Sequence, residues 1–247
     1  REFSFAVNGK TEPARFNRDS TKMLLTYHPR GFGEADFAVF DLKTGERKDF
    51  VSGISLQAAD WAGEKIALVG GWPAARNAQV LDGIIRHGGE LTLRLMDING
   101  VEESQSVVID GPIFNSNSSF PDPGYNRIHE IAIDPKGRQL AVGFYSKELE
   151  SRVVTVNLAP PQLQAQISLG FTKDNRLLKA NGLFYFQDGE KFGVTHFGAE
   201  GKIFASSSAT PIAAIPGKGP LGVATSRDGR LLAIAMSSEL LIYEVRK

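Results

Sequence analysis

The stretch Ile131-Ala132-Ile133-Asp134-Pro135-Lys136-Gly137-Arg138-Gln139-Leu140-Ala141-Val142-Gly143 decides the fold. It reads as two short apolar strands joined by a tight polar turn, because Asp bonds its own backbone and Gly adopts positive φ where the chain reverses. The same pattern returns at 14–27 and at 223–234, and a degenerate copy covers 58–69. A hairpin that recurs in this way predicts a repeat protein.

Each hairpin is followed by a third apolar strand that ends in a polar turn, most clearly at 37–46 and 91–100. A more polar fourth strand comes next, as at 47–51, 105–109 and 162–169. Segments with a convincing helical periodicity are missing from the sequence. Repeats of four antiparallel strands are typical of the blades of a β-propeller, so the sequence predicts an all-β propeller.

The repeats divide the single domain 1–247 into about five four-stranded blades, at 11–52, 53–111, 127–170, 171–218, and 219–247 plus 1–10. Six blades remain an alternative, because 171–218 holds two hairpin-like segments. In the last blade, the third strand at Leu240–Val245 has no fourth strand after it. We expect the N-terminal strand Glu2–Val7 to pair there and close the propeller, since exposed strand edges invite aggregation.

Two segments resemble the WD40-type β-propeller family. Phe40-Asp41-Leu42-Lys43-Thr44-Gly45-Glu46 is similar to the third-strand signature of that family, with Phe in place of Trp. The segment 129–137 is similar to its first strand and the following turn. The Trp-Asp dipeptide and the Gly-His pair of the family are missing, which places the chain nearer the divergent bacterial WD40-like or TolB-like propellers.

The composition excludes several classes of function. Cysteine is absent, which excludes disulfides, thiolate catalysis and Cys-ligated metal sites. The 28 Lys+Arg balance the 28 Asp+Glu, so no nucleic-acid partner is expected. Apolar runs such as Leu231–Met236 fall far short of the ~20 residues that span a bilayer, so no membrane span is expected. The compartment stays open between cytoplasm and periplasm.

Few residues are candidates for catalysis. Glycoside hydrolysis needs two carboxyl groups around the scissile bond, and only Glu130 lies at the entrance of a predicted inner strand. Asp60, Asp134 and Asp228 fall at or near turns, where we expect structural roles. Nucleophile-elbow and phosphate-loop motifs are missing. The four histidines show no local ligand spacing, so neither a metal nor a cofactor is predicted.

Two long insertions, Pro73–Glu90 and Gly111–Arg127, fall on one face of the predicted propeller, and loops longer than ~12–15 residues are usually functional or disordered. Aromatic, Arg and His residues in these loops and at nearby strand ends suit contact with a partner. The predicted partner-binding residues are His28, Trp72, Arg76, Arg86, Phe120, Tyr125, Arg127 and His196.

The sequence therefore predicts a non-catalytic interaction or scaffold propeller that binds a protein or a neighbouring domain of a larger chain. Because the sequence begins at Arg1 rather than Met, we expect a processed product or part of a longer protein. The alternative is a five-bladed carbohydrate-active propeller, a glycoside hydrolase or a lectin, centred on Glu130. Enzymatic activity stays open between these two readings.

Overall fold

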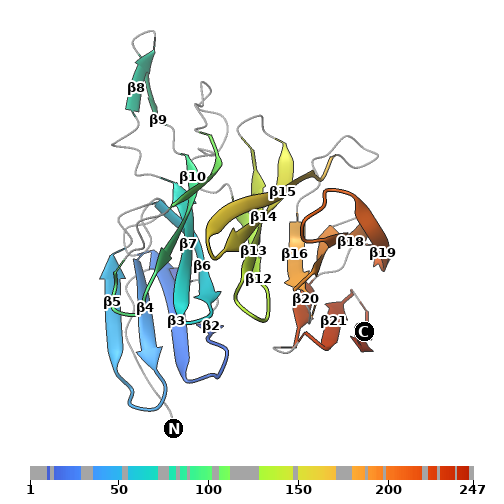
Figure 1. Cartoon of the computed structure of the whole chain (residues 1–247), viewed down its shortest axis with the longest axis horizontal. Helices are drawn as coiled ribbons and strands as arrows, with labels where there is room; N and C mark the ends of the chain where they lie inside the picture. Colours follow the sequence, from blue (N-terminus) through green and yellow to red (C-terminus); the bar gives the residue numbers. More distant parts are fainter. Residues whose placement is uncertain are drawn as a thin grey trace. The chain divides into compact units, whose positions relative to one another are not determined.

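The computed structural model describes residues 10–11, 14–28, 36–51, 55–71, 78–81, 84–87, 90–101, 106–111, 128–146, 150–170, 180–186, 189–196, 199–218, 222–226, 229–236 and 238–244. Within these ranges every element is a β-strand and none is a helix (Figure 1). The chain divides into two compact units, Arg1–Arg127 and Ile128–Lys247, and each is described by itself.

The first unit holds two blade-type antiparallel sheets. One contains β1 (Lys10–Thr11), β2 (Arg15–Phe16), β3 (Lys22–His28), β4 (Asp36–Asp41) and β5 (Arg47–Val51), in the order β1-β3-β4-β5 with β2 also paired to β3. The other contains β6 (Ser55–Ala62), β7 (Lys65–Gly71), β10 (Leu91–Met96) and β11 (Val107–Asp110). Alternate strand residues such as Leu24 and Phe37 pack on Leu56 and Trp61 of the second sheet, which forms one shared core.

The second unit holds three sheets in which consecutive strands pair. They are β12 (Ile128–Ile133), β13 (Gln139–Tyr145), β14 (Ser151–Leu158) and β15 (Pro161–Ser168); β16 (Ala180–Tyr185), β17 (Lys191–His196), β18 (Ala199–Ala205) and β19 (Pro211–Lys218); and β20 (Gly222–Thr225), β21 (Leu231–Ala235) and β22 (Leu240–Glu244). Val153 and Ile167 pack against Leu183 and Phe192, and Ile215 packs against Leu232, so successive sheets share cores.

The prediction of an all-β propeller with about five blades is confirmed. Phe184–His196 contributes to the hairpin β16–β17 of one sheet, which favours five blades over six. The sheets are not equal in width, because the first has five strands and the last has three among the described residues. The expected closing strand Glu2–Val7 lies outside the described residues, so its pairing stays a prediction.

The turn that reveals the repeat is the same in three sheets. Its first residue is Asn17, Asp134 or Ser226, and the side-chain oxygen of that residue accepts the N–H of the residue five positions on, at 2.8 Å in each case. The third residue after it has positive φ, at Ser20 (55°), Gly137 (69°) and Gly229 (68°). A polar first residue and a later residue with positive φ, which is glycine in two of the three turns, therefore specify the hairpin locally, and this is why the pattern is visible in the sequence.

Candidate functional site

The structure describes few of the predicted partner-binding residues. Trp72, Arg76, Phe120, Tyr125 and Arg127 lie outside the described residues. Arg86 belongs to β9 and pairs with Gln79, and His28 ends β3 and pairs with Lys10. His196 ends β17, and its side chain is 1% exposed. The partner-binding surface predicted from the sequence therefore stays a prediction.

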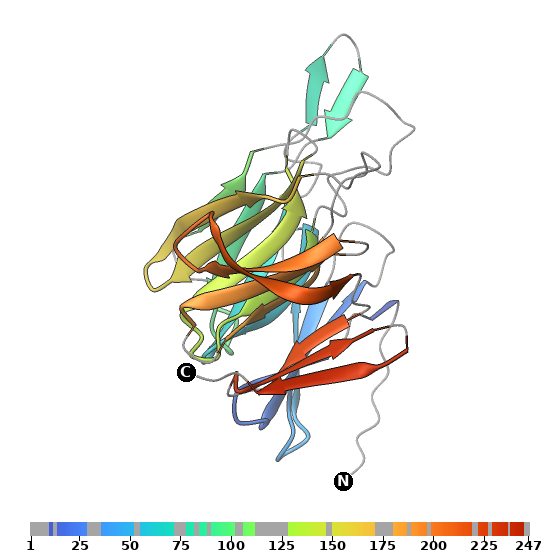
Figure 2. The same ribbon diagram turned by 90° about the vertical axis from the view of Figure 1, so that its right-hand side faces the viewer.

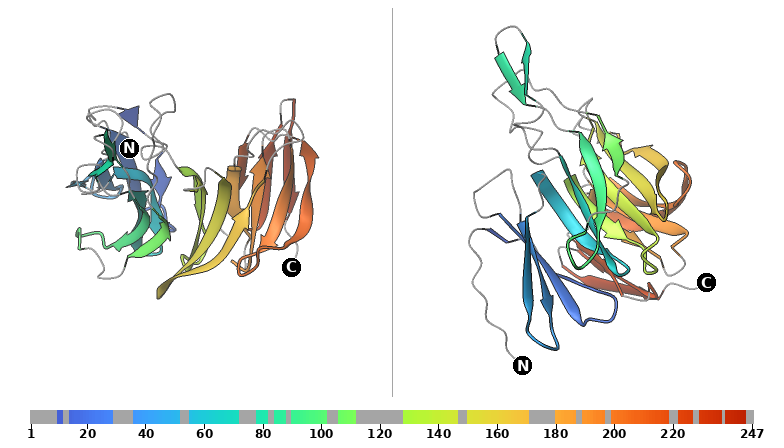
Figure 3. Two further views of the ribbon diagram at one scale, coloured as in Figure 1. Left: turned by 90° about the horizontal axis from the view of Figure 1, so that it is seen from above. Right: turned by 60° about the vertical axis from the view of Figure 1, so that its left-hand side comes forward.

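The insertion Pro73–Glu90 contains a separate two-stranded sheet, formed by β8 (Ala78–Leu81) and β9 (Ile84–His87). Its register places Val80 opposite Ile85 and Leu81 opposite Ile84. Figure 1, Figure 2 and Figure 3 all draw β8 and β9 as a separate pair of strands, which lies between β7 and β10 in the chain. A two-stranded hairpin on its own is marginally stable in water.

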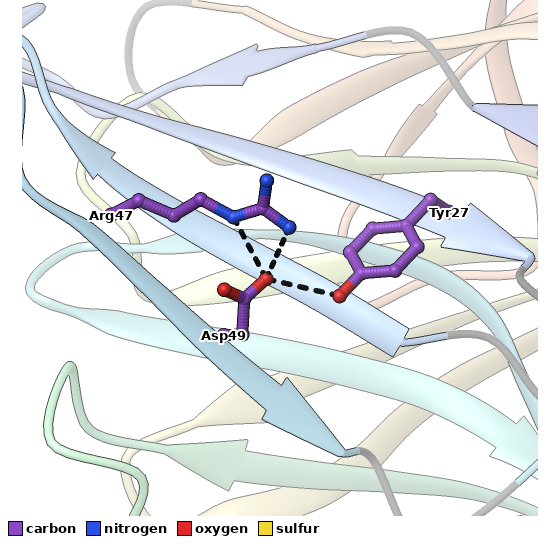
Figure 4. A network of polar contacts seen from close by, with 3 residues as sticks. All are labelled: Tyr27, Arg47 and Asp49. Carbon is purple, nitrogen blue, oxygen red and sulfur yellow. Dashed lines mark hydrogen bonds and ion pairs between the residues drawn. The ribbon is translucent and has the colours of Figure 1, made fainter. Parts of the chain in front are cut away.

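One polar network crosses the first sheet, with Tyr27 on β3 and Arg47 and Asp49 on β5 (Figure 4). The Tyr27 hydroxyl donates to Asp49 Oδ1 at 3.0 Å. The Arg47 guanidinium donates to the same oxygen from Nε at 2.9 Å and from Nη2 at 2.5 Å. The three donors therefore meet at one carboxylate oxygen, and Oδ2 of Asp49 takes part in none of these bonds.

The strand register explains how residues on β3 and β5 meet across β4. Leu25, Ala38 and Asp49 form one row across the sheet, and Ala38 is fully buried. Because Ala38 has a short side chain, Tyr27 and Arg47 can extend over β4 above it. The Arg47 guanidinium also lies 5.6 Å from the ring centroid of Phe40 and 6.0 Å from that of Tyr27, within the range of cation–π attraction.

The contacts in this network raise the pKa values of Tyr27 and Arg47. Burial, followed by the hydrogen bond to Asp49, raises the pKa of Tyr27 above its ordinary value. The hydrogen bond to Asp49 also raises the pKa of Arg47. The side chains of Arg47 and Asp49 are 28% and 51% exposed, so a partner can reach the network from solvent. The site thus presents an aromatic ring, a cation and a carboxylate in fixed positions.

A second feature repeats at the start of three inner strands. The ladder between β6 and β7 skips Gln57, the ladder between β12 and β13 skips His129, and the ladder between β16 and β17 skips Asn181. Each is a β-bulge, in which two residues of one strand lie opposite a single residue of the next strand. The residue is polar in all three cases.

The bulges at His129 and Asn181 lie in neighbouring sheets of the second unit. A Cβ placed on Gly143, which pairs with Glu130, would lie 3.0 Å from the Cβ of Ala180. Ala180 directly precedes Asn181, so the two bulged segments are close in space. The ring of His129 lies edge-on to Tyr145, with centroids 4.1 Å apart and planes at 81°.

Asp134 acts within its turn, in agreement with the expected structural role. Its buried carboxylate accepts the backbone N–H groups of Arg138 and Gln139, the latter at 2.8 Å. Asp60 accepts the N–H of Trp61 at 2.7 Å, and burial raises its pKa despite the opposing charge of Arg15. Asp228 lies outside the described residues.

Two kinds of larger feature are absent from the part of the chain that the structure describes. There, no group of three or more His, Asp or Glu residues is arranged to hold a metal ion. No helix there is long and apolar enough to cross a membrane.

Comparison with known proteins supports the fold. No protein-family model matches the sequence, and no curated protein matches it. Among solved structures, the chain is similar to the hydrazine synthase of Kuenenia stuttgartiensis, with a TM-score of 0.61 and 14% sequence identity. The similarity covers 94% of this chain and 70% of that one. At this identity the likeness shows the fold alone, and it supports the assignment of this chain as a β-propeller.

Proposed function

We propose that this chain is a non-catalytic recognition propeller, a divergent relative of the WD40-like and TolB-like propellers, which binds a protein or a neighbouring domain. The observation that carries the proposal is the Tyr27–Arg47–Asp49 network. Tyrosine and arginine dominate the energetics of protein interfaces, and here both are held before binding. Side chains that are already fixed lose little conformational entropy when a partner arrives.

The network has capacity left for a partner. Asp49 Oδ2 can accept a hydrogen bond from a backbone N–H or a Lys side chain, and the half-exposed aromatic ring of Tyr27 offers apolar area. His28 directly follows Tyr27, so one of the residues predicted from the sequence adjoins this site. We propose that the remaining contacts come from the loop insertions 73–90 and 111–127. The β8–β9 hairpin lies in the first of these insertions, and a partner surface packed against it would stabilise it.

The test begins with the partner that co-purifies with the intact chain, whose affinity is then measured for variants. Arg47→Ala should weaken binding by about 30-fold or more, the loss expected for a hot-spot residue. The matched control is Arg152→Ala, because Arg152 forms a similar exposed ion pair with Glu150 at 2.8 Å on another sheet. The control should change affinity less than about twofold.

A second set of variants tests the loops. Phe120→Ala with Tyr125→Ala, and separately Trp72→Ala, should lower the affinity while the melting temperature stays within a few degrees. Affinity that stays within about twofold for Arg47→Ala and for all the loop variants would contradict the proposed function. A fall in melting temperature without a fall in affinity would assign these side chains to local packing.

A further inference from the structure

The second unit carries an apolar cavity that the proposed function does not use. It lies between the sheet β16–β19 and the sheet β20–β22 and has a volume of about 200 Å³. Phe186, Ile215 and Leu232 form buried walls of the cavity. The exposed residues Ala214 and Tyr243 also line it, so it opens to solvent. We infer that this cavity binds one aromatic side chain of a partner protein, presented by a segment that is not acidic.

The repeat provides the first step of the argument, because it identifies equivalent positions in the two sheets. The residue six positions after the start of the hairpin turn is Phe192 in the sheet β16–β19 and Leu232 in the sheet β20–β22. Phe192 pairs with Phe204 on the next strand, and Leu232 pairs with Tyr243. Each pair belongs to the second and third strands of its sheet, so the two pairs can be compared directly.

The equivalent place in the preceding core is filled by two aromatic rings. Phe192 and Phe204 are 0% and 2% exposed, and their rings stack with centroids 5.5 Å apart. Both belong to one core cluster with Ile167 of the sheet β12–β15. In the last sheet, Leu232 is smaller than phenylalanine and Tyr243 is 38% exposed. The cavity therefore lies where the repeat elsewhere places an aromatic side chain.

The size and the walls of the cavity select the ligand. An apolar cavity of about 150 Å³ accepts benzene, so a space of about 200 Å³ can hold one aromatic side chain. Pockets for drug-sized small molecules are larger, at about 300–1,000 Å³. An aromatic side chain seated in a desolvated pocket is a typical hot spot of a protein interface. Of the described residues that line the cavity, Glu244 is the one that is charged at neutral pH, which disfavours an acidic partner segment.

The inference goes beyond the proposed function, because the Tyr27–Arg47–Asp49 network lies on a different sheet. Arg47→Ala should accordingly leave binding at the cavity within twofold of the wild type. A chain whose partner depends on Arg47, but which binds no aromatic peptide, would overturn only the inference drawn here. A chain that binds the aromatic peptide, but whose partner is indifferent to Arg47 and to the loop variants, would contradict only the proposed function.

The experiment measures binding of capped hexapeptides to the full chain by saturation-transfer NMR titration. The probe carries a central Phe-Lys pair between Ser-Gly and Gly-Ser. Two matched peptides carry alanine in place of the phenylalanine, or glutamate in place of the lysine. The probe should show saturation transfer to its ring protons and bind at least tenfold more tightly than the alanine peptide. It should also bind more tightly than the glutamate peptide.

Variants then locate the binding. Leu232→Phe places inside the cavity the side chain that Phe192 supplies in the neighbouring sheet, and it should weaken binding at least tenfold while the melting temperature stays level or rises. The matched control is Leu163→Phe, the same exchange at an exposed position of β15, which should leave the affinity within twofold. Ala214→Leu narrows the opening at an exposed position and should give the same loss of binding if Leu232→Phe does not fold.

Four results would overturn the inference. One is the absence of saturation transfer to the phenylalanine peptide from the folded wild-type chain. Another is equal weakening by Leu232→Phe and Leu163→Phe. Peptide binding that appears only when Phe3 and Phe5 are replaced by serine would assign the cavity to the N-terminal segment of this chain. Toluene is titrated in parallel, and binding of toluene without binding of the peptide would assign the cavity to a free small molecule.

Discussion

The sheets β16–β19 and β20–β22 begin with the same hairpin turn but differ in how well they are packed. In both turns the first residue, Phe186 or Ser226, donates its N–H to the carbonyl five residues on. The third strand of the wider sheet is covered, so that Phe204 is 2% exposed, whereas Ile242 on β22 is 65% exposed. Phe204 belongs to the core shared with the sheet β12–β15. Among the described residues, β19 pairs with β18, whereas no fourth strand pairs with β22. Local turn chemistry therefore forms a hairpin in either case, but burial of the sheet depends on its neighbours.

The largest difference in stability between the two sheets should appear when one glycine in each is replaced by alanine, which adds a methyl group. A Cβ at Gly193 on β17 would lie 2.1 Å from Cζ of Phe184, a core residue that is 3% exposed. Gly193→Ala should therefore destabilise the protein by about 3 kcal/mol or more in urea unfolding, since an overpacked core cannot relax freely. A Cβ at Gly222 on β20 meets nothing within 4 Å, so Gly222→Ala should change stability by less than about 0.5 kcal/mol. Equal losses for the two variants would contradict the difference in packing.

A similar difference separates the hairpin turn between β12 and β13 from the turn between β20 and β21. Asp134 accepts several backbone N–H groups with a fully buried carboxylate, and a Cβ on Gly189, in the first turn of the neighbouring sheet, would lie 2.5 Å from its Oδ2. Asp134→Ala should cost about 2–3 kcal/mol, because these donors would lose a charged acceptor. Ser226 accepts the N–H of Leu231 at an exposed site, so Ser226→Ala should cost about 0.5–1 kcal/mol. Asp134→Asn, which keeps one acceptor oxygen, should fall between these values.

These turns are the part of the fold that the sequence reveals best. Asn17, Asp134 and Ser226 act through hydrogen bonds within five residues, so their effect is visible in a short window. The β8–β9 hairpin carries an equally local signal, with Asp82-Gly83 between the apolar pairs Val80-Leu81 and Ile84-Ile85, yet the length of the insertion led us to expect only a loop.

The candidate sites were harder to predict because their contacts are not local. Tyr27 and Asp49 are 22 positions apart, and they meet only because the register of three strands places Ala38 between them. The bulges at His129 and Asn181 depend on one extra residue in a strand, which changes neither composition nor hydrophobic periodicity. Glu130 stands out in the sequence, but nothing in the sequence connects it with Asn181.

A polar substitution in a strand gives a second contrast between the sheets β16–β19 and β20–β22. Val194 on β17 is fully buried, so Val194→Thr, which keeps the shape, should cost about 1–2 kcal/mol for a hydroxyl placed in the core. Ile242→Thr on β22 should change stability by less than about 0.5 kcal/mol, because this side chain is mostly in solvent. Urea unfolding of both variants measures the contrast. A loss at Ile242 as large as that at Val194 would mean that a further segment covers β22 in solution.

The smallest effect on stability at neutral pH is expected when a tyrosine in each sheet is replaced by phenylalanine. Here the substitution at the buried position should stabilise the protein, whereas the buried substitutions above destabilise it. The hydroxyl of Tyr185 on β16 is buried and has no hydrogen-bond partner in the described part of the chain, whereas Tyr243 on β22 is 38% exposed. Tyr185→Phe should therefore stabilise the protein by about 1 kcal/mol, since it removes a desolvated polar group. Tyr243→Phe should have almost no effect at neutral pH, because water can satisfy that hydroxyl.

The dependence of stability on alkaline pH tests whether the Tyr185 hydroxyl is desolvated in the folded chain. Burial, and then the charge of Asp134, raise the pKa of Tyr185 above the ordinary value of about 10. The folded chain thus holds this proton more tightly than the unfolded chain. The resulting contribution to stability is fully present below about pH 10 and is lost as the pH rises through the folded-state pKa. The stability advantage of Tyr185→Phe over the wild type should accordingly grow between about pH 9 and pH 11 in urea titrations. An advantage that stays constant across this range would show that the hydroxyl finds a partner or water in the folded protein.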